Sequence, residues 1–121
     1  MDAGERILLL EACPESRRRL EADLRQAGLS TRAFSRPQVL FNPPTNTDRQ
    51  EIGCLIIDPE LLELPPADFL ARLRQAGWMQ PTLFVSRRPI LAEVVAAIKA
   101  GAQDFFQEPV TAASLLAAVR E

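Results

Sequence analysis

The stretch Cys54-Leu55-Ile56-Ile57-Asp58-Pro59-Glu60 is the starting point for interpreting this 121-residue chain. Its apolar and β-branched run predicts a buried strand, which stops at a carboxylate because proline cannot continue it. In an open α/β sheet, ligands bind at the carboxyl ends of the strands. Asp58 is therefore predicted to lie where chemistry would occur.

The composition is that of one soluble globular domain, with 47% apolar and 25% charged residues. A net charge of −2 gives this domain no electrostatic reason to contact nucleic acid. Histidine is absent, and the two cysteines, Cys13 and Cys54, are predicted to be buried free thiols rather than part of a zinc site. No apolar run reaches the ~20 residues that span a membrane, and no signal-peptide pattern begins the chain. We expect one cytoplasmic domain over 1–121, without membrane contact.

Strand and helix patterns alternate along the whole chain. Strands are predicted over 7–10, 31–34, 54–57, 81–86 and 104–106. Helices are predicted over 15–27, from a cap at Ser35, from a cap at Asp68, over 89–100, and from a cap at Thr111 through Val119. This order predicts a parallel sheet covered by helices on both faces.

Polar side chains follow four of these strands. Glu11 follows the first strand, Asp58 the third, Ser86 the fourth, and Glu108 lies just beyond the fifth. Because the carboxyl ends of parallel strands share one edge of the sheet, these side chains are expected to face a common pocket.

At these positions the chain resembles a known family, the receiver (CheY-like) domains of two-component response regulators. The resemblance covers essentially the whole chain and depends on LLEACP at 9–14, IID at 56–58, FVS at 84–86 and, most specifically, IKAGAQDFFQEP at 98–109. It implies a flavodoxin-like three-layer fold: a doubly wound (βα)5 domain with a five-stranded parallel sheet in the order 2-1-3-4-5.

The resemblance also implies roles for the pocket. In the family, the aspartate that ends the third strand accepts a phosphoryl group from a histidine kinase, and this position is Asp58. Two acidic residues after the first strand hold Mg²⁺, and these positions are Glu11 and Ala12. A hydroxyl after the fourth strand bonds the phosphate, here Ser86, and a lysine before the last proline pairs with it, here replaced by Glu108.

Three departures from the family pattern point in the same direction. Ala12 removes a metal ligand, Glu108 inverts a charge, and Arg87 follows Ser86 where the family usually has a small residue. A charge reversal at ~4 Å from a phosphoryl group is worth several kcal/mol at an effective dielectric near 20. We therefore predict a degenerate receiver, or pseudo-receiver, that is not an enzyme, has no catalytic residue and uses no metal.

Other interpretations of the same residues stay open. In one, Asp58 still accepts phosphate within a phosphorelay, with Mg²⁺ bound and Arg87 or Arg88 supplying the missing positive charge. In another, Asp58 only caps a loop or pairs with an arginine, and we expect Arg87 or Arg88 to neutralise both Asp58 and Glu108. A flavodoxin-like small-molecule binder is disfavoured, because no glycine-rich phosphate loop follows any strand.

The last two predicted helices offer a surface to partners. In the 89–100 helix the large apolar residues exceed one stripe, and the opposite side is largely alanine; in the last helix Ala113, Ala117 and Ala118 are expected outside. Alanine also simply favours helix. The resemblance favours a homodimer through the 89–119 face, with Leu91, Val95, Ala113 and Ala117 as interface candidates and Phe105 at the family's aromatic switch position.

The function expected from these observations is that of a phosphorylation-independent protein-interaction and dimerisation module in signal transduction or transcriptional control. Receivers often continue into an output domain, so the 121 residues are compatible with the N-terminal part of a longer regulator, with an output domain after Glu121. The sequence does not specify the partner or the input signal.

Overall fold

The computed structural model describes residues 6–42 and 49–120, and its five parallel strands confirm the predicted order β2-β1-β3-β4-β5. The strands are β1 (Arg6–Leu10), β2 (Ser30–Phe34), β3 (Cys54–Ile57), β4 (Thr82–Ser86) and β5 (Asp104–Gln107). The α-helices are α1 (Pro14–Gln26), α2 (Pro66–Gln75), α3 (Leu91–Lys99) and α4 (Ala112–Val119). Short 3-10 turns are η2 (Pro37–Leu40), η3 (Arg49–Glu51) and η4 (Pro59–Leu61).

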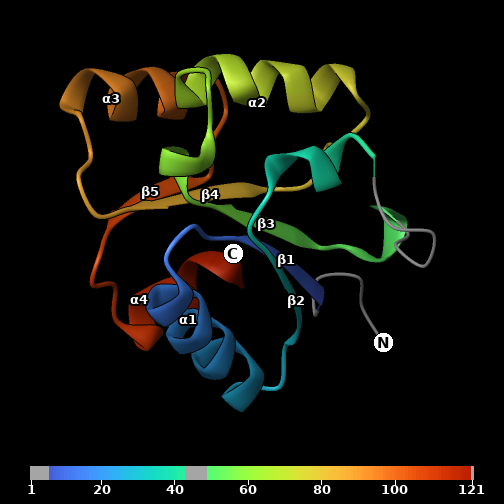
Figure 1. Ribbon diagram of the computed structural model, residues 1–121, viewed down its shortest axis with the longest axis vertical. Coiled ribbons are helices and arrows are strands. Elements are labelled where there is room, and N and C mark those ends of the chain that lie inside the picture. The colour runs from blue at the N-terminus through green and yellow to red at the C-terminus, as the bar shows by residue number, and fades with distance from the viewer. Residues whose placement is uncertain (1–5, 43–48, 121) are drawn as a thin grey trace.

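The helices form two layers around the sheet. Helices α2 and α3 cover one face, and α1 and α4 cover the other (Figure 1). Every residue of β3 is buried because the strand lies in the centre of this sandwich. Leu55 and Ile57 pack into the apolar cluster beneath α2, while Cys54 and Ile56 pack into the cluster that includes α1 and α4 residues. No helix in the described part of the chain is long and apolar enough to cross a membrane.

Two predicted helix starts are wrong. The second helix is only the four-residue turn η2, preceded by Arg36 without a side-chain cap, so Ser35 does not cap it. Helix α2 begins at Pro66, which places Asp68 inside its first turn instead of at the cap. In both cases proline, whose fixed φ suits the first helical position, sets the start. Thr111 does cap α4, since its Oγ accepts a hydrogen bond of 3.1 Å from the Ser114 amide.

Helix α3 leaves most of its large apolar residues exposed, including the interface candidates Leu91 and Val95. Ala97 is its only buried residue, whereas Leu91 is 77% exposed and both Val95 and Ile98 are 44% exposed. The small side chain of Ala97 lets the helix lie close to its neighbours, so the large residues are left on the outside. In α4, Ala113 and Ala117 are exposed as expected, but Ala118 is buried.

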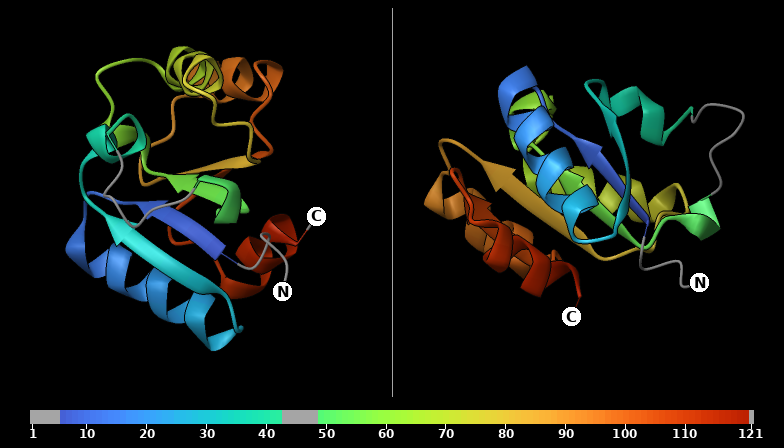
Figure 2. Two further views of the ribbon diagram at one scale, coloured as in Figure 1. Left: turned by 90° about the vertical axis from the view of Figure 1, so that its right-hand side faces the viewer. Right: turned by 90° about the horizontal axis from the view of Figure 1, so that it is seen from below.

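The polar residues that follow the strands come together at one edge of the sheet. In Figure 2 the strands run side by side, and the connections that leave their carboxyl ends share one side of the molecule. The pairing of β1 with β3 places Leu10 beside Ile57, and the pairing of β4 with β5 places Ser86 beside Gln107. The residues after these four strands are therefore neighbours.

Candidate functional site

Asp58 lies at the carboxyl end of β3, where the sheet itself fixes its position. Its amide donates to the Leu10 carbonyl at 2.7 Å, which extends the pairing of β1 with β3. The carboxylate is only 2% exposed. Its Oδ2 accepts from the Ala12 amide at 3.1 Å and its Oδ1 accepts from the Glu60 amide at 2.9 Å. Asp58 thus caps η4 and joins the β1–α1 loop to the β3–α2 loop.

Glu11 lies beside Asp58 and is almost completely buried. Its Oε2 accepts from the Cys13 amide at 3.2 Å, while its Oε1 has no hydrogen-bond partner among the described residues. Burial, followed by the hydrogen bond to Asp58 and the negative charge of Asp58, raises the pKa of Glu11 to about 8. A carboxyl with this pKa is largely protonated at neutral pH. The buried position beside Asp58 therefore favours the neutral form of Glu11.

Glu108 brings a third carboxyl to the cluster. Its amide donates to the Ser86 carbonyl at 2.8 Å, and its side chain is only 5% exposed. Burial raises the pKa of Glu108; the nearby Arg19 opposes this shift, and Asp58 adds to it. Nη2 of Arg19 lies 3.5 Å from Oε1 of Glu108, and Nη1 of Arg19 donates to the Val110 carbonyl at 3.2 Å. An arginine of α1 thus faces the carboxyl that replaces the family's lysine.

Neither Arg87 nor Arg88 forms the expected ion pair with Asp58 or Glu108 among the described residues, although the charge of Arg87 acts to lower the pKa of Glu108. Arg87 instead pairs with Glu60, with Nη2 3.2 Å from Oε2. Both side chains of this pair stay partly exposed, so the contact forms without the cost of burying the guanidinium beside Asp58. Arg88 makes no ion pair with the described residues, and its amide donates to Oγ of Ser86 at 3.2 Å.

The remaining predicted positions differ in environment. Ser86 is buried at the end of β4 and is held by this contact with Arg88. Phe105 is half-buried, and its ring stacks on Phe84 with the centroids 5.5 Å apart. Cys54 is buried, which raises its pKa to about 12. Cys13 is only partly buried, so the prediction of a buried thiol is wrong there; hydrogen bonds with Ser16 lower its pKa.

The donor set of this pocket is poor for a magnesium ion. Mg²⁺ requires oxygen ligands, preferably ionised carboxylates, in octahedral geometry. Ala12 offers only a methyl group, Glu11 must first lose a proton, and both oxygens of Asp58 accept backbone N–H groups. Among residues 6–42 and 49–120, no group of three or more His, Cys, Asp or Glu residues is arranged to hold a metal ion. The residues present therefore do not fit the ion that the family uses.

Glu60 and Arg19 were not identified as site residues from the sequence. Glu60 and Arg87 follow the neighbouring strands β3 and β4, so their opposite charges at adjacent strand ends were an available signal. Arg19 gave no such signal, because its contact with Glu108 depends on how α1 approaches the loop between β5 and α4. On sequence spacing alone, Arg19 was better matched to Glu15 in its own helix.

Comparison with known proteins identifies relatives of the chain. No family model matches it. It is 37% identical over 101 residues to the response regulator protein TodT of Pseudomonas putida, covering 84% of this chain and 43% of TodT. It is 34% identical over 101 residues to the response regulator protein TmoT of Ectopseudomonas mendocina, covering 84% of this chain and 44% of TmoT. The chain thus spans less than half the length of these relatives.

Solved structures of receivers have the same fold. Full-length FixJ from B. japonicum aligns over 95% of this chain and 57% of its own with a TM-score of 0.81 and 24% identity. The beryllofluoride-activated NtrC4 receiver domain dimer aligns over 96% of this chain and 93% of its own with a TM-score of 0.82 and 15% identity. At these identities the likeness shows the fold, and the relatives above carry the closer sequence relationship.

Proposed function

Because this chain belongs to the response-regulator receiver (CheY-like) family of two-component signalling, we propose that it acts as a phosphorylation-independent protein-interaction module. On this proposal Asp58 organises the fold of the pocket instead of accepting a phosphoryl group. Glu11 and Ser86 then remain from the family's phosphorylation site, in which Ala12 and Glu108 are altered.

The observation that carries this proposal is the buried carboxyl of Glu108. Its side chain is 5% exposed, and the negative charge of Asp58 contributes to its raised pKa. The two carboxyl groups therefore interact electrostatically. A phosphoryl group on Asp58 would add negative charge beside it. At ~4 Å and an effective dielectric near 20, each such pair of like charges costs about 4 kcal/mol. Arg19 and Arg87 offset this cost only in part, because each is already paired with a carboxylate.

The second part of the proposal concerns the face formed by α3 and α4. Leu91, Val95 and Ile98 are exposed on α3, and Ala113 and Ala117 are exposed on α4. The two helices lie on opposite faces of the sheet beside the edge strand β5, and exposed apolar side chains on both favour an interaction surface along that edge. We propose that this face binds a second copy of the chain, with the same patch on both copies. The NtrC4 receiver, which has the same fold, was solved as a dimer, and that likeness supports the proposal.

The regulatory output is proposed to lie outside these residues. The chain spans less than half of TodT and TmoT, and both are response regulators. We propose that the output, such as transcriptional control, is delivered by a further domain or a bound partner. The domain itself then works by contact and not as a conventional enzyme.

Mass spectrometry of the intact protein tests the central proposal. The purified chain is incubated with a small-molecule phosphodonor and Mg²⁺, and we expect no phosphoryl adduct. A receiver that keeps both acidic residues and the lysine, treated with the same donor, is the positive control. An adduct that forms on the wild-type chain and is lost in Asp58→Asn would overturn the proposal and favour a phospho-acceptor.

A further inference from the structure

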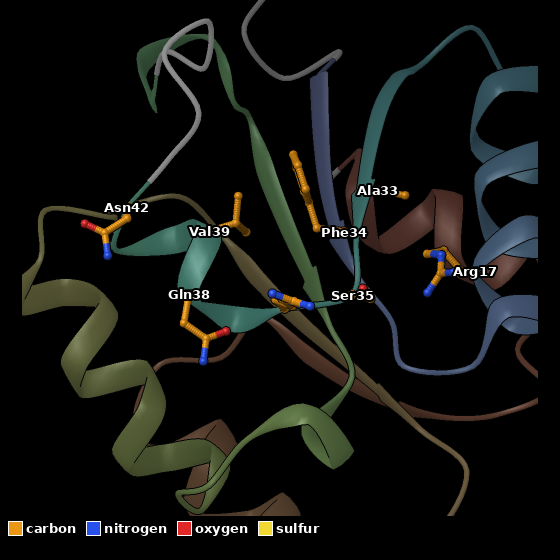
Figure 3. A pocket seen from close by; sticks show the side chains of 8 residues that line it. Arg17, Ala33, Phe34, Ser35, Gln38, Val39 and Asn42 are labelled. Carbon is orange, nitrogen blue, oxygen red and sulfur yellow. The ribbon is translucent and has the colours of Figure 1, made fainter.

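The outer edge of β2 forms an open recess that the proposed function does not use. Strand β2 is at one edge of the sheet, next to β1 only. The recess at its carboxyl end measures about 540 Å³ and is lined by residues of α1, β2 and η2. In Figure 3, Phe34 and Val39 lie together on the η2 side of the strand, while Arg17 and Ala33 lie on the α1 side. Both faces of the strand therefore contribute to this β2-edge recess.

The backbone of β2 leaves part of its edge unpaired. The Phe34 carbonyl accepts from the Glu11 amide at 3.2 Å, so Phe34 turns its backbone groups toward β1. Because alternate residues of a strand turn these groups to opposite edges, Thr31 and Ala33 face outward, and Ser35 lies just beyond the end of β2. Arg25 caps the outward carbonyl of Thr31 at 3.0 Å. Among the described residues, nothing caps the backbone of Ala33 in the same way.

Among the residues that the structure describes, the recess is lined by positive charge without negative charge. Arg17 and Arg36 are the ionisable residues of this described lining. Neither forms an ion pair with the described residues, although Nη1 of Arg17 donates to the Glu11 carbonyl at 2.9 Å. Ser35 and Arg36 are exposed, so the recess is too shallow to enclose a small molecule as ligand pockets usually do. Its shape and charge suit an extended, negatively charged segment of polypeptide.

We propose that the β2-edge recess binds an extended acidic segment of a partner protein by adding it as a sixth strand to the sheet. The segment's backbone pairs with Ala33, in the mode of β-strand addition, and continues past the end of β2 beside Ser35. Side chains of an added strand alternate between the two faces. Those on the α1 side meet Arg17 and are acidic, whereas those on the η2 side meet Phe34 and Val39 and are apolar.

A capped six-residue peptide of alternating Glu and Val is the probe, and the same peptide with Lys in place of Glu is its control. We expect the Glu peptide to shift the backbone amide NMR signals of Ala33 and Ser35 with saturable binding, and the Lys peptide to bind at least about fivefold more weakly. Absence of shifts at Ala33 and Ser35, or equal binding of both peptides, overturns the proposal.

Two pairs of variants test the two parts of the recognition. Ala33→Pro removes the outward N–H, which an edge strand tolerates, and Ala33→Val keeps it. We expect the proline variant to bind the Glu peptide about fivefold more weakly than the valine variant, from the loss of about one hydrogen bond. Arg36→Glu is expected to weaken binding about fivefold or more relative to Arg36→Gln. If Ala33→Pro does not fold, the comparison of these two Arg36 variants tests the proposal.

Sedimentation of the chain without peptide distinguishes the other possible occupant. If wild-type self-association were lost in Ala33→Pro and kept in Ala33→Val, the edge would belong to a second copy of the chain, and the proposal would be overturned. We expect both variants to have the oligomeric state of the wild type.

Discussion

Arg19 of α1 and Glu108 of the β5–α4 loop face each other across 3.5 Å, one largely open to solvent and the other almost fully buried. The family places a lysine at the position of Glu108, where it pairs with the phosphoryl group. Here the positive charge comes from a different element, and it is directed at the carboxyl that took the lysine's place. The contact joins two segments that flank the Asp58 pocket, so its loss has a predictable effect on stability.

Replacing Arg19 by Gln is expected to lower the free energy of unfolding by about 1 kcal/mol. The change leaves the buried Glu108 carboxyl without its ion pair and removes the donor of the Val110 carbonyl. Urea denaturation measures the loss. Arg18→Gln is the matched control, because Arg18 is exposed and forms no ion pair with the described residues. Equal losses in the two variants would contradict a stabilising role for the Arg19–Glu108 contact.

Glu11 is expected to make the domain less stable as pH rises. Burial and Asp58 raise the pKa of Glu11 from 4.5 to about 8, so between these values the folded state binds a proton that the unfolded state has released. The free energy of unfolding contributed by this group then falls by up to about 1.4 kcal/mol per pH unit, and it levels off above pH 8. The raised pKa of Glu108 acts with the same sign.

Glu11→Gln is the variant that isolates this effect. An amide keeps the shape and can still donate to Asp58, but it does not titrate. Urea denaturation from pH 5 to pH 9 should show the variant gaining stability over the wild type as pH rises. Glu15→Gln, at an exposed position of α1, is the control and should follow the wild type. Parallel pH profiles of the wild type and Glu11→Gln would mean that Glu11 does not hold this proton.

The sequence predicted the sheet and the position of the site because both depend on local patterns. Continuous apolar runs specify strands buried on two faces, and the polar residue after each run marks the strand end. The parallel arrangement then brings Glu11, Asp58, Ser86 and Glu108 together without further information. The ion pairs were harder to predict from the sequence, because Arg19 and Arg87 each pair with a carboxylate from another segment of the folded chain.

The excess of large apolar residues on α3 was visible in the sequence, but which residue faces the core could not be predicted, for a related reason. Hydrophobic periodicity assumes that the large apolar residues face the core, but close packing of α3 requires a small one. Ala97 fills that position, so Leu91, Val95 and Ile98 are left outside. This assumption holds for a helix that packs only against the core of its own domain. Because the large apolar residues of α3 are exposed instead, we expect a partner to cover them.

Val95→Glu is expected to weaken self-association of the chain at least tenfold. Val95 lies in the middle of the exposed apolar face of α3, and a buried, unpaired carboxylate in the dimer costs well over 1.4 kcal/mol, the equivalent of a factor of about ten. Sedimentation equilibrium measures the association. Met79→Glu is the control, because Met79 is also an exposed apolar side chain, 68% exposed against 44% for Val95, and lies outside this face. A wild-type chain that is monomeric at high concentration, or a weaker dimer in both variants, would contradict the proposed interface.

Restoring the family's charges should restore its chemistry, if Ala12 and Glu108 are what removed it. We expect Ala12→Asp combined with Glu108→Lys to accept a phosphoryl group at Asp58 from a small phosphodonor in the presence of Mg²⁺. The new carboxylate supplies a metal ligand, and the lysine replaces repulsion of the phosphoryl group by attraction. Intact mass should show an adduct that requires Mg²⁺ and is lost when Asp58→Asn is added.

The neutral pair Ala12→Asn and Glu108→Gln is the control, since it matches the new side chains in polarity without their charge. If the charged double variant folds with an unchanged melting temperature and still forms no adduct, then Arg87 or the backbone amides on Asp58 block the reaction, and the charges at 12 and 108 are not the cause.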